Sequence, residues 1–278
     1  MTVNLQKIEY KNFLIATLSL YILASIPLLI FFRHQLNPDG ISYISIAHKY
    51  ASGDFGSAIN GLWSPMYSWL LVPFLALGVD AQLSAKLLNL LFGLLTIIAI
   101  YGLTRKLELG KLSTNLVLVC TAAVALSFAN RVITPDLLSV LLLLIYFNVI
   151  FDKDYSAGIK QGVICGILGA FAYFSKGYML TFFIGHFVLM NILRWFLCKY
   201  TDEKKRLFIN MLCGIFVFMA LCSPWILLLS SKYEKFTITN AGAFNMALVS
   251  PGFDERLQYT DGFIPPANSS ATSFMEDP

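Results

Sequence analysis

Residues 13–32 of the chain are FLIATLSLYILASIPLLIFF, twenty consecutive positions without a charged side chain. An α-helix rises 1.5 Å per residue, so about 20 apolar residues cross the ~30 Å hydrocarbon core of a bilayer. The run is longer than the apolar region of a typical secretory signal peptide, and it lacks a clear small-residue cleavage site. It therefore predicts an uncleaved membrane anchor, and with it an integral membrane protein.

The composition of the whole chain agrees with this prediction. Of its 278 residues, 57% are hydrophobic and 13% are charged, whereas a soluble domain has roughly 45–50% apolar and about 25% charged residues. The mean hydropathy is +0.70. The net charge of +4 comes mostly from basic residues in short loops between apolar stretches, a pattern that sets membrane topology rather than one that binds nucleic acid. A soluble globular enzyme is thereby excluded.

Further apolar stretches predict further spans. The stretch from Ile159 to Leu197 is too long for one crossing, and Ser175, Lys176 and Gly177 interrupt it. We therefore expect two helices joined by a tight turn there, with Lys176 at a membrane surface. The expected spans are Phe13–Phe32, Leu87–Gly102, Leu112–Ala129, Pro135–Phe151, Ile159–Phe174, Tyr178–Leu197 and Leu207–Leu229. The predicted fold class is an all-α, polytopic transmembrane bundle of about seven spans.

The segment from Pro65 to Gly78 decides the topology. It is apolar, but fourteen helical residues reach only about 21 Å, and Pro73 interrupts the hydrogen bonds of a helix. If the segment does not cross and the N-terminus is cytoplasmic, the cytoplasmic loops hold more Lys and Arg than the outer ones, including the cluster Lys204–Arg206, as the positive-inside rule requires. We therefore expect residues 33–86 to form an extracytoplasmic loop with juxtamembrane helices, and the tail 230–278 to be extracytoplasmic.

Asp39 lies in this loop, within the sequence NPDGISYISIAHKY. Ile41, Ile44, Ala47 and Tyr50 share a helical spacing, with Tyr43 and Ile46 nearby, which predicts an amphipathic helix along the membrane surface. Asp39 either caps this helix by accepting backbone N–H bonds or acts as a base. Both roles can coexist, because the positive end of a helix favours the ionised carboxylate that a base needs. The pattern leaves these alternatives open.

Asp136 follows Thr134 and Pro135 at the expected start of an apolar helix, where a threonine caps and a proline fits the first turn. An acid in a first helical turn commonly interacts with the helix dipole, and a functional role requires that Asp136 lie beside Asp39. Arg131 is a candidate phosphate ligand, a bridge to Asp136 or an interfacial anchor. The sequence does not choose among these roles.

Lys176 interrupts an otherwise apolar stretch, where an ionisable group is costly unless it reaches an interface or a partner. It either extends to the membrane surface from a helix end or contacts a phosphate. The expected topology places Asp39, Asp136 and Lys176 at one extracytoplasmic boundary. His186 lies alone in an apolar helix, a position typical of a packed, hydrogen-bonded side chain. No HExxH, paired CxxC, Walker loop, GxSxG or dinucleotide motif occurs in the sequence, so nucleotide-driven transport has no support.

The order of several short motifs resembles a known family. The motifs are PDGISYISIAHKYASGDFGSAINGLWSPMYSWL, YGLTRKL, TPDLLSVLLLLIYF, FSKGYML and CSPWILLL, and they extend over about Leu14–Leu229. Their order resembles the N-terminal half of the polyprenyl-phosphate-sugar-dependent glycosyltransferases of the GT-C superfamily. The similar groups are the protein O-mannosyltransferase-like and the bacterial aminoarabinose-transferase-like membrane enzymes.

The resemblance implies an inverting glycosyltransferase that moves a sugar from a polyprenyl-phosphate donor to a hydroxyl of a glycan, lipid or protein acceptor. It implies a GT-C-like fold in which residues 1–229 form the catalytic module. Residues 230–278 are then expected to begin a region that continues in longer relatives. We expect the reaction at the extracytoplasmic face of the plasma (inner) membrane.

The resemblance also implies roles for individual residues. Asp39 stands in the place of the acidic residue of the first outer loop, with Gly40 where many relatives have a second acid. Asp136 matches a second loop acid, and Lys176 matches a Lys-Gly pair near the donor phosphate, for which Arg131 is the second candidate. We expect Asp39 to accept the proton of the acceptor hydroxyl and Lys176 to stabilise the phosphate. Asp136 is expected to orient the acceptor or to hold a divalent cation.

Two other classes compete with a transferase. A transporter would place polar groups at mid-bilayer on broken helices, often in two related halves, whereas the candidate charges here are expected at one boundary. A non-catalytic subunit or a fragment of a larger transferase is the third class, and co-purification with a longer transferase would identify it.

Overall fold

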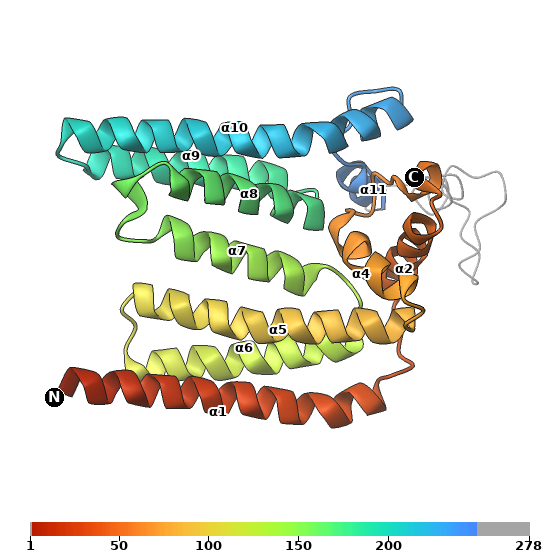
Figure 1. Ribbon diagram of the computed structural model, residues 1–278, viewed down its shortest axis with the longest axis horizontal. Coiled ribbons are helices and arrows are strands. Elements are labelled where there is room, and N and C mark those ends of the chain that lie inside the picture. Colours follow the sequence, from red (N-terminus) through yellow and green to blue (C-terminus); the bar gives the residue numbers. More distant parts are fainter. Residues whose placement is uncertain (1, 249–278) are drawn as a thin grey trace.

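The computed structural model describes residues 2–248, and this part of the chain is helical, with no strand within it. Long helices lie side by side in a bundle, and successive ones run in opposite directions (Figure 1). These helices are α1 (Thr2–Phe31), α5 (Ala81–Lys106), α6 (Lys111–Arg131), α7 (Asp136–Ile150), α8 (Lys160–Ser175), α9 (Met179–Leu197) and α10 (Thr201–Lys232). The predicted all-α polytopic bundle is confirmed.

Five of the described helices are long and apolar enough to cross a membrane: α1 from Tyr10 onwards, α5, α6, α9 and α10. The other two predicted spans correspond to α7 with 15 residues and α8 with 16, which gives lengths of about 23 Å and about 24 Å. Helix α7 contacts both α5 and α8, and it buries Leu137, Leu141 and Tyr146. The chain is a multi-pass membrane protein in which two of the predicted spans are shorter than the rest.

Helix α5 begins earlier than the apolar pattern indicated. The expected span started at Leu87, but the helix starts at Ala81, after Asp80, whose carboxylate accepts a hydrogen bond from the Leu83 N–H at 2.7 Å. Lys86 therefore lies inside the helix and is buried, with 1% of its surface exposed, rather than in the preceding loop. The apolar pattern placed the start of the helix after Lys86, because a lysine interrupts an apolar run whether or not its ammonium is buried.

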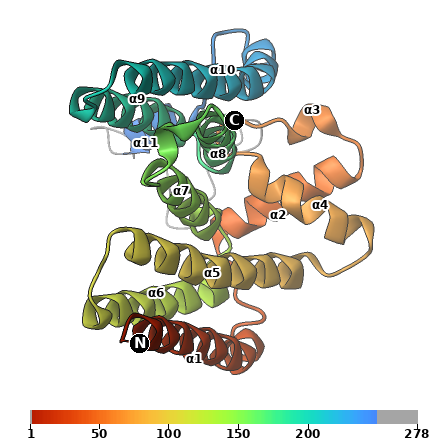
Figure 2. The same cartoon turned by 60° about the vertical axis from the view of Figure 1, so that its left-hand side comes forward.

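Short helices gather at one end of the bundle (Figures 1 and 2). These are α2 (Pro38–Ala51), α3 (Phe55–Ala58), α4 (Met66–Ala76) and α11 (Ala241–Leu248). Helix α4 has 11 residues and continues through Pro73. It packs against α2, and the Ser68 hydroxyl donates to the Tyr43 carbonyl at 2.8 Å. The segment that decides the topology thus forms a short helix beside the first loop helix.

The predicted helix of the first loop is present, and its buried face is centred on Tyr43, Ile46 and Ala47 rather than on Ile41. Ile41 is exposed, whereas Tyr43, Ile46 and Ala47 are buried. The reason is the neighbouring helix α4: the ring of Tyr43 packs edge-on against the ring of Tyr67, with 5.6 Å between the centroids. This contact turns the apolar face of α2 toward α4.

The bundle contains two hydrophobic cores. One surrounds Ile97 and Leu118, and the other surrounds Phe187 and Phe218. In the second core α8 and α10 approach closely at Gly166. A Cβ atom at this position would lie only 2.3 Å from the backbone oxygen of α10 that it faces. Small residues permit such close helix packing in membranes.

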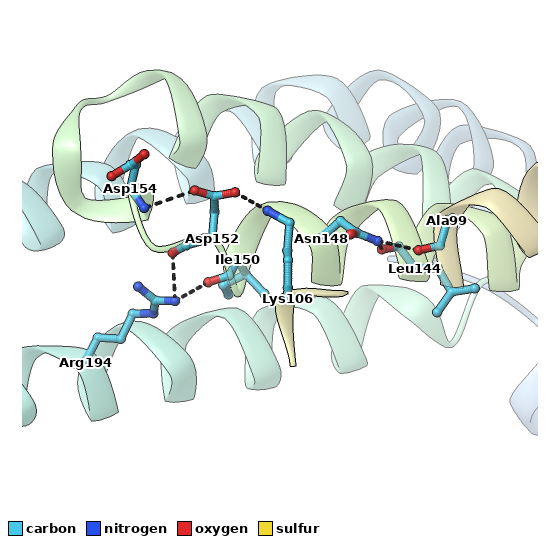
Figure 3. Close-up of polar contacts among 8 residues, drawn as sticks. All are labelled: Ala99, Lys106, Leu144, Asn148, Ile150, Asp152, Asp154 and Arg194. Carbon is cyan, nitrogen blue, oxygen red and sulfur yellow. Dashed lines mark hydrogen bonds and ion pairs between the residues drawn. The ribbon is translucent and has the colours of Figure 1, made fainter. Parts of the chain in front are cut away.

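The end of the bundle opposite the short helices carries a group of polar contacts (Figure 3). Lys106 at the end of α5 forms an ion pair with Asp152, which follows α7. The other carboxylate oxygen of Asp152 accepts from the Asp154 N–H at 3.0 Å. Arg194 of α9 donates to the Ile150 carbonyl at 2.6 Å and to the Asp152 carbonyl at 3.3 Å. These contacts tie α5, α7 and α9 together.

Candidate active site at one end of the bundle

Asp136 and Lys176 form an ion pair where two neighbouring helices meet. Asp136 is the first residue of α7, and Lys176 directly follows α8. Their Oδ1 and Nζ atoms are 2.8 Å apart, and both side chains are partly exposed. One turn deeper, the hydroxyls of Ser139 and Ser175 are 2.8 Å apart in the buried interface. The antiparallel packing of α7 and α8 therefore brings two residues that lie forty positions apart into direct contact.

The start of α7 differs by one residue from the expected one. Pro135 occupies the N-cap position rather than the first turn, and no side chain caps the helix. Thr134, predicted to be the cap, instead hydrogen-bonds the Asp136 carboxylate. Asp136 is thus held by a hydroxyl on one side and by the Lys176 ammonium on the other.

Asp39 lies in the first turn of α2, and Asn37 rather than Asp39 occupies the N-cap position. Asn37 does not cap the helix with its side chain, and its Oδ1 atom accepts the Ile133 N–H at 2.7 Å. Burial raises the pKa of the Asp39 carboxyl above its ordinary value, the charge of Lys176 lowers that pKa, and the charge of Asp136 raises it. The three predicted residues therefore share one electrostatic environment.

A cavity of about 460 Å³ lies at this site. Asp39 and Lys176 both line it, while Asp136 holds Lys176 by the ion pair. Its other lining residues include the aromatic side chains of Tyr43, Trp63 and Tyr178. A cavity of this size is within the range of small-molecule sites, about 300–1,000 Å³. It combines a carboxyl group, an ammonium group and aromatic surfaces in one concave site.

The aromatic residues were quoted in motifs of the sequence but not predicted as site residues. The rings of Tyr43 and Trp63 pack edge-on with 5.3 Å between their centroids. Tyr43 is buried, and burial together with the nearby carboxylates of Asp39 and Asp136 raises the pKa of its phenol. Its hydroxyl therefore stays protonated and is able to donate a hydrogen bond. The sequence did contain a signal for two of these residues, because Tyr43 lies four positions after Asp39 and Tyr178 lies two positions after Lys176.

One wall of the cavity comes from a segment that the sequence assigned to a tail. After α10 the chain returns to the first loop, where the Asn240 N–H donates to the Gly61 carbonyl at 2.7 Å. The Thr239 hydroxyl donates to the same carbonyl at 3.0 Å, and the Tyr173 hydroxyl donates to the Ile238 carbonyl at 2.7 Å. No local pattern in the sequence indicates these contacts. The rest of the predicted tail, residues 249–278, lies outside the described residues.

Arg131 lies apart from the cavity. It is exposed at the end of α6, and its guanidinium lies over the ring of Phe32, with 5.7 Å between the guanidinium carbon and the ring centroid. This position is typical of an interfacial anchor, one of the three roles left open. The structure thus brings Asp39, Asp136 and Lys176 together, and Arg131 belongs to the neighbouring helix end.

The residues at the cavity do not fit a divalent cation. Among the described residues no group of three or more His, Cys, Asp or Glu side chains is placed to hold a metal ion. The Oδ1 atom of Asp136 is already bound by the Lys176 ammonium. Hard divalent cations require several oxygen ligands, and this site offers a lysine instead.

The fold and the site together define a class: a multi-pass membrane protein with a polar cavity at one end of its helices. Within this class, residues 63–228 match the family of dolichyl-phosphate-mannose-protein mannosyltransferases. The match covers more than half of the chain, and the chain belongs to this family. It is therefore a membrane glycosyltransferase of the GT-C type that uses a lipid-linked sugar. No curated protein and no solved structure matches it.

Proposed function

We propose that the protein transfers a sugar from a polyprenyl-phosphate donor to an acceptor hydroxyl within the cavity, with inversion at the anomeric carbon. The observation that carries this proposal is that Asp39 and Lys176 line one cavity at the end of the membrane helices, with Lys176 held by Asp136. A lipid-linked sugar has its chain in hydrocarbon and its reacting carbon at the membrane surface. The cavity offers polar groups at that boundary.

Asp39 acts as the general base in this proposal. Its carboxylate accepts the proton of the acceptor hydroxyl while the hydroxyl oxygen forms a bond to the anomeric carbon. The bond from that carbon to the phosphate oxygen breaks, and the lipid phosphate leaves with the electron pair. General-base assistance contributes typically 10²–10⁴-fold to the rate. The raised pKa of Asp39 favours this role, because a stronger base accepts a proton more readily near neutral pH.

Lys176 stabilises the leaving phosphate. Negative charge develops on the phosphate oxygen as the bond breaks, so a nearby ammonium stabilises the transition state more than the ground state. Asp136 orients this ammonium, since the ion pair of 2.8 Å fixes the Lys176 side chain. The contacts favour this positioning role over the orientation of an acceptor or the binding of a cation. Arg131 has no part in the proposal, because it lies over Phe32.

The aromatic side chains of Tyr43, Trp63 and Tyr178 are proposed to contact the sugar. Ligand sites are lined mainly by apolar and aromatic groups with a few polar groups that fix orientation, and a pyranose ring presents apolar C–H faces to such surfaces. The catalytic module in this proposal includes residues 1–229 together with the segment that begins at Ile238, because that segment lies against the first loop.

We further propose that the cavity faces the extracytoplasmic side of the plasma membrane, with the N-terminus in the cytoplasm. This orientation is supported by the basic cluster Lys204–Arg206, which follows the positive-inside rule. The cluster begins α10 at the end of the bundle opposite the cavity (Figure 1). Labelling of single cysteines from either side of the membrane tests it, and labelling of positions 39 and 204 from the same side would contradict it.

The direct test supplies membranes that contain the wild-type chain, Asp39→Asn or Lys176→Ala with labelled polyprenyl-phosphate sugars. We expect transfer by the wild type and its loss in both variants at normal expression. Unchanged transfer by both variants would remove the assignment. Solute uptake into vesicles without sugar transfer would indicate a transporter instead.

A further inference from the structure

Lys86 is a buried cation that the proposed reaction does not use. Only 1% of the residue is exposed, and its Nζ atom donates to the backbone carbonyls of Phe32 and Asn130, the latter at 3.0 Å. Within residues 2–248 no carboxylate forms an ion pair with it. A buried ammonium without a counter-charge is costly. These two carbonyls must therefore compensate for the loss of water.

The two carbonyls belong to the ends of two helices. Phe32 directly follows α1, and Asn130 lies in the last turn of α6. The last carbonyls of a helix have no partner within it, and they carry the negative end of the helix dipole. The Phe32 carbonyl also accepts the Gln35 N–H, at 2.9 Å. A cation that binds such carbonyls stabilises both helix ends. Lys86 thus fastens the ends of α1 and α6 to α5.

The two fastened helix ends are the starting points of the segments that carry the acids. Residues 33–37 lead from α1 to Asp39, and residues 132–135 lead from α6 to Asp136. The two segments also contact each other through Asn37 and the Ile133 N–H, as described above.

Helix α5 supplies a second contact to this region one turn further along. The Asn89 amide donates to the Val132 carbonyl at 2.9 Å, and its Oδ1 atom accepts from the Tyr67 hydroxyl at 3.0 Å. Asn89 lies three residues after Lys86 and therefore on the same face of the helix. One polar face of α5 thus holds the segment that precedes Asp136.

The two acid-bearing segments pack closely against each other at Gly40. A Cβ atom at Gly40 would lie 2.8 Å from the Ile133 Cβ atom and 2.9 Å from the Asn37 Oδ1 atom. Glycine therefore permits the close approach of α2 to the segment before α7. A shift of either segment would displace Asp39, which is the neighbour of Gly40 in the chain.

We propose that Lys86 is a positioning residue for the transfer reaction: it holds the ends of α1 and α6 and thereby fixes Asp39 and Asp136 relative to the cavity. The inference rests on the proposed function, and it adds a residue that touches neither substrate. Loss of the Lys86 charge loosens both segments. The chemical step then slows, whereas the binding of the donor, which depends on the cavity walls, changes little.

The experiment compares Lys86→Met with Lys106→Met, two substitutions of the same kind at opposite ends of one helix. Hydrogen–deuterium exchange is measured for peptides that contain residues 33–40 and 131–137, and kcat and KM are measured with a labelled polyprenyl-phosphate sugar. In Lys86→Met we expect exchange at both segments to rise about tenfold or more. The variant loses hydrogen bonds to a charged group, and the loss of one such bond shifts a local opening equilibrium by about that factor. We expect kcat to fall by about tenfold or more with KM little changed. In Lys106→Met we expect neither change.

Each other outcome has a defined meaning. Unchanged exchange at both segments in Lys86→Met, or equal changes in Lys106→Met, would overturn the inference. If Lys86→Met does not fold, Lys86→Gln keeps a hydrogen-bond donor but removes the charge, and unchanged exchange at both segments in that variant would overturn the inference as well. Absence of transfer by the wild type would overturn the proposed function and the inference with it. Transfer by the wild type with unchanged exchange in Lys86→Met would overturn the inference alone.

Discussion

The two ends of the bundle use charged residues differently. At the end shown in Figure 3, Lys106 is paired with Asp152, and Arg194 donates to the carbonyls of Ile150, the last residue of α7, and of Asp152. At the cavity end, Lys176 is paired with Asp136. The Asp39 carboxylate there has no hydrogen bond or ion pair within the described residues, and burial raises its pKa.

This difference separates a structural network from a reactive site. The charged groups at the Figure 3 end bind one another and backbone carbonyls, and so hold helices together. A partly buried carboxylate in a cavity, with a shifted pKa and no bonded partner, is typical of a functional group. The variants below test whether the chemistry is confined to the cavity end.

The largest effect is expected for Asp39→Asn. Asparagine keeps the size of the side chain but accepts no proton at neutral pH, so kcat/KM for sugar transfer should fall by about 10²–10⁴-fold. The matched control is Asp54→Asn in the same loop, where the side chain caps α3 by accepting the Ser57 N–H at 3.2 Å. Asparagine also caps helices well, so this variant should keep full activity. Equal losses in both variants would contradict the role of Asp39.

A somewhat smaller effect is expected at the ion pair. Lys176→Met removes the charge that faces the leaving phosphate, and kcat should fall by about 10²–10³-fold, as for other groups that stabilise developing charge. Asp136→Asn leaves the ammonium in place but releases it, so its loss should be smaller, about tenfold. A larger loss in Asp136→Asn than in Lys176→Met would show that Asp136 itself contacts the reacting groups.

Several parts of this comparison could be predicted from the sequence. The long apolar runs predict the helices, and the alternation of spans puts Asp39, Asp136 and Lys176 at one end of the bundle. The helix boundaries were less predictable where a charge is buried, as Lys86 shows. The carbonyls that accept its ammonium lie at the ends of α1 and α6. A lysine in an apolar run does not indicate whether such carbonyls lie nearby.

The walls of the cavity could not be predicted. The contact of Thr239 with Gly61 joins residues separated by most of the chain, and neither position belongs to a periodic pattern. Trp63 and Tyr43 resemble ordinary interfacial aromatic residues until the packing of α2 and α4 directs them into the cavity. Local periodicity predicts helices and their exposed faces, whereas these contacts depend on how the loops fold back over the bundle.

The pH dependence of transfer gives a finer test of the cavity end. A base works only when it is deprotonated, so kcat/KM should fall as the pH drops through the pKa of Asp39. Because burial raises this pKa, the fall should occur above the ordinary aspartate value of about 3.9. Lys176 lowers the pKa of Asp39, so Lys176→Met should move the acid limb of the profile to higher pH. A pH–rate profile of both proteins measures the shift, and a move to lower pH would contradict the coupling.

The smallest effect is expected at the opposite end of the bundle. Lys106→Met breaks the ion pair with Asp152, but the two side chains are 29% and 38% exposed, and solvent screens such pairs. The variant should therefore lose about 1 kcal/mol of stability or less, measured as a small decrease in the temperature of unfolding in detergent. Its kcat should equal that of the wild type, because Arg194 still fastens the end of α7 through the Ile150 carbonyl. A large loss of transfer in Lys106→Met would mean that the two ends are coupled through α5, and the separation of structural and reactive charges would then not hold.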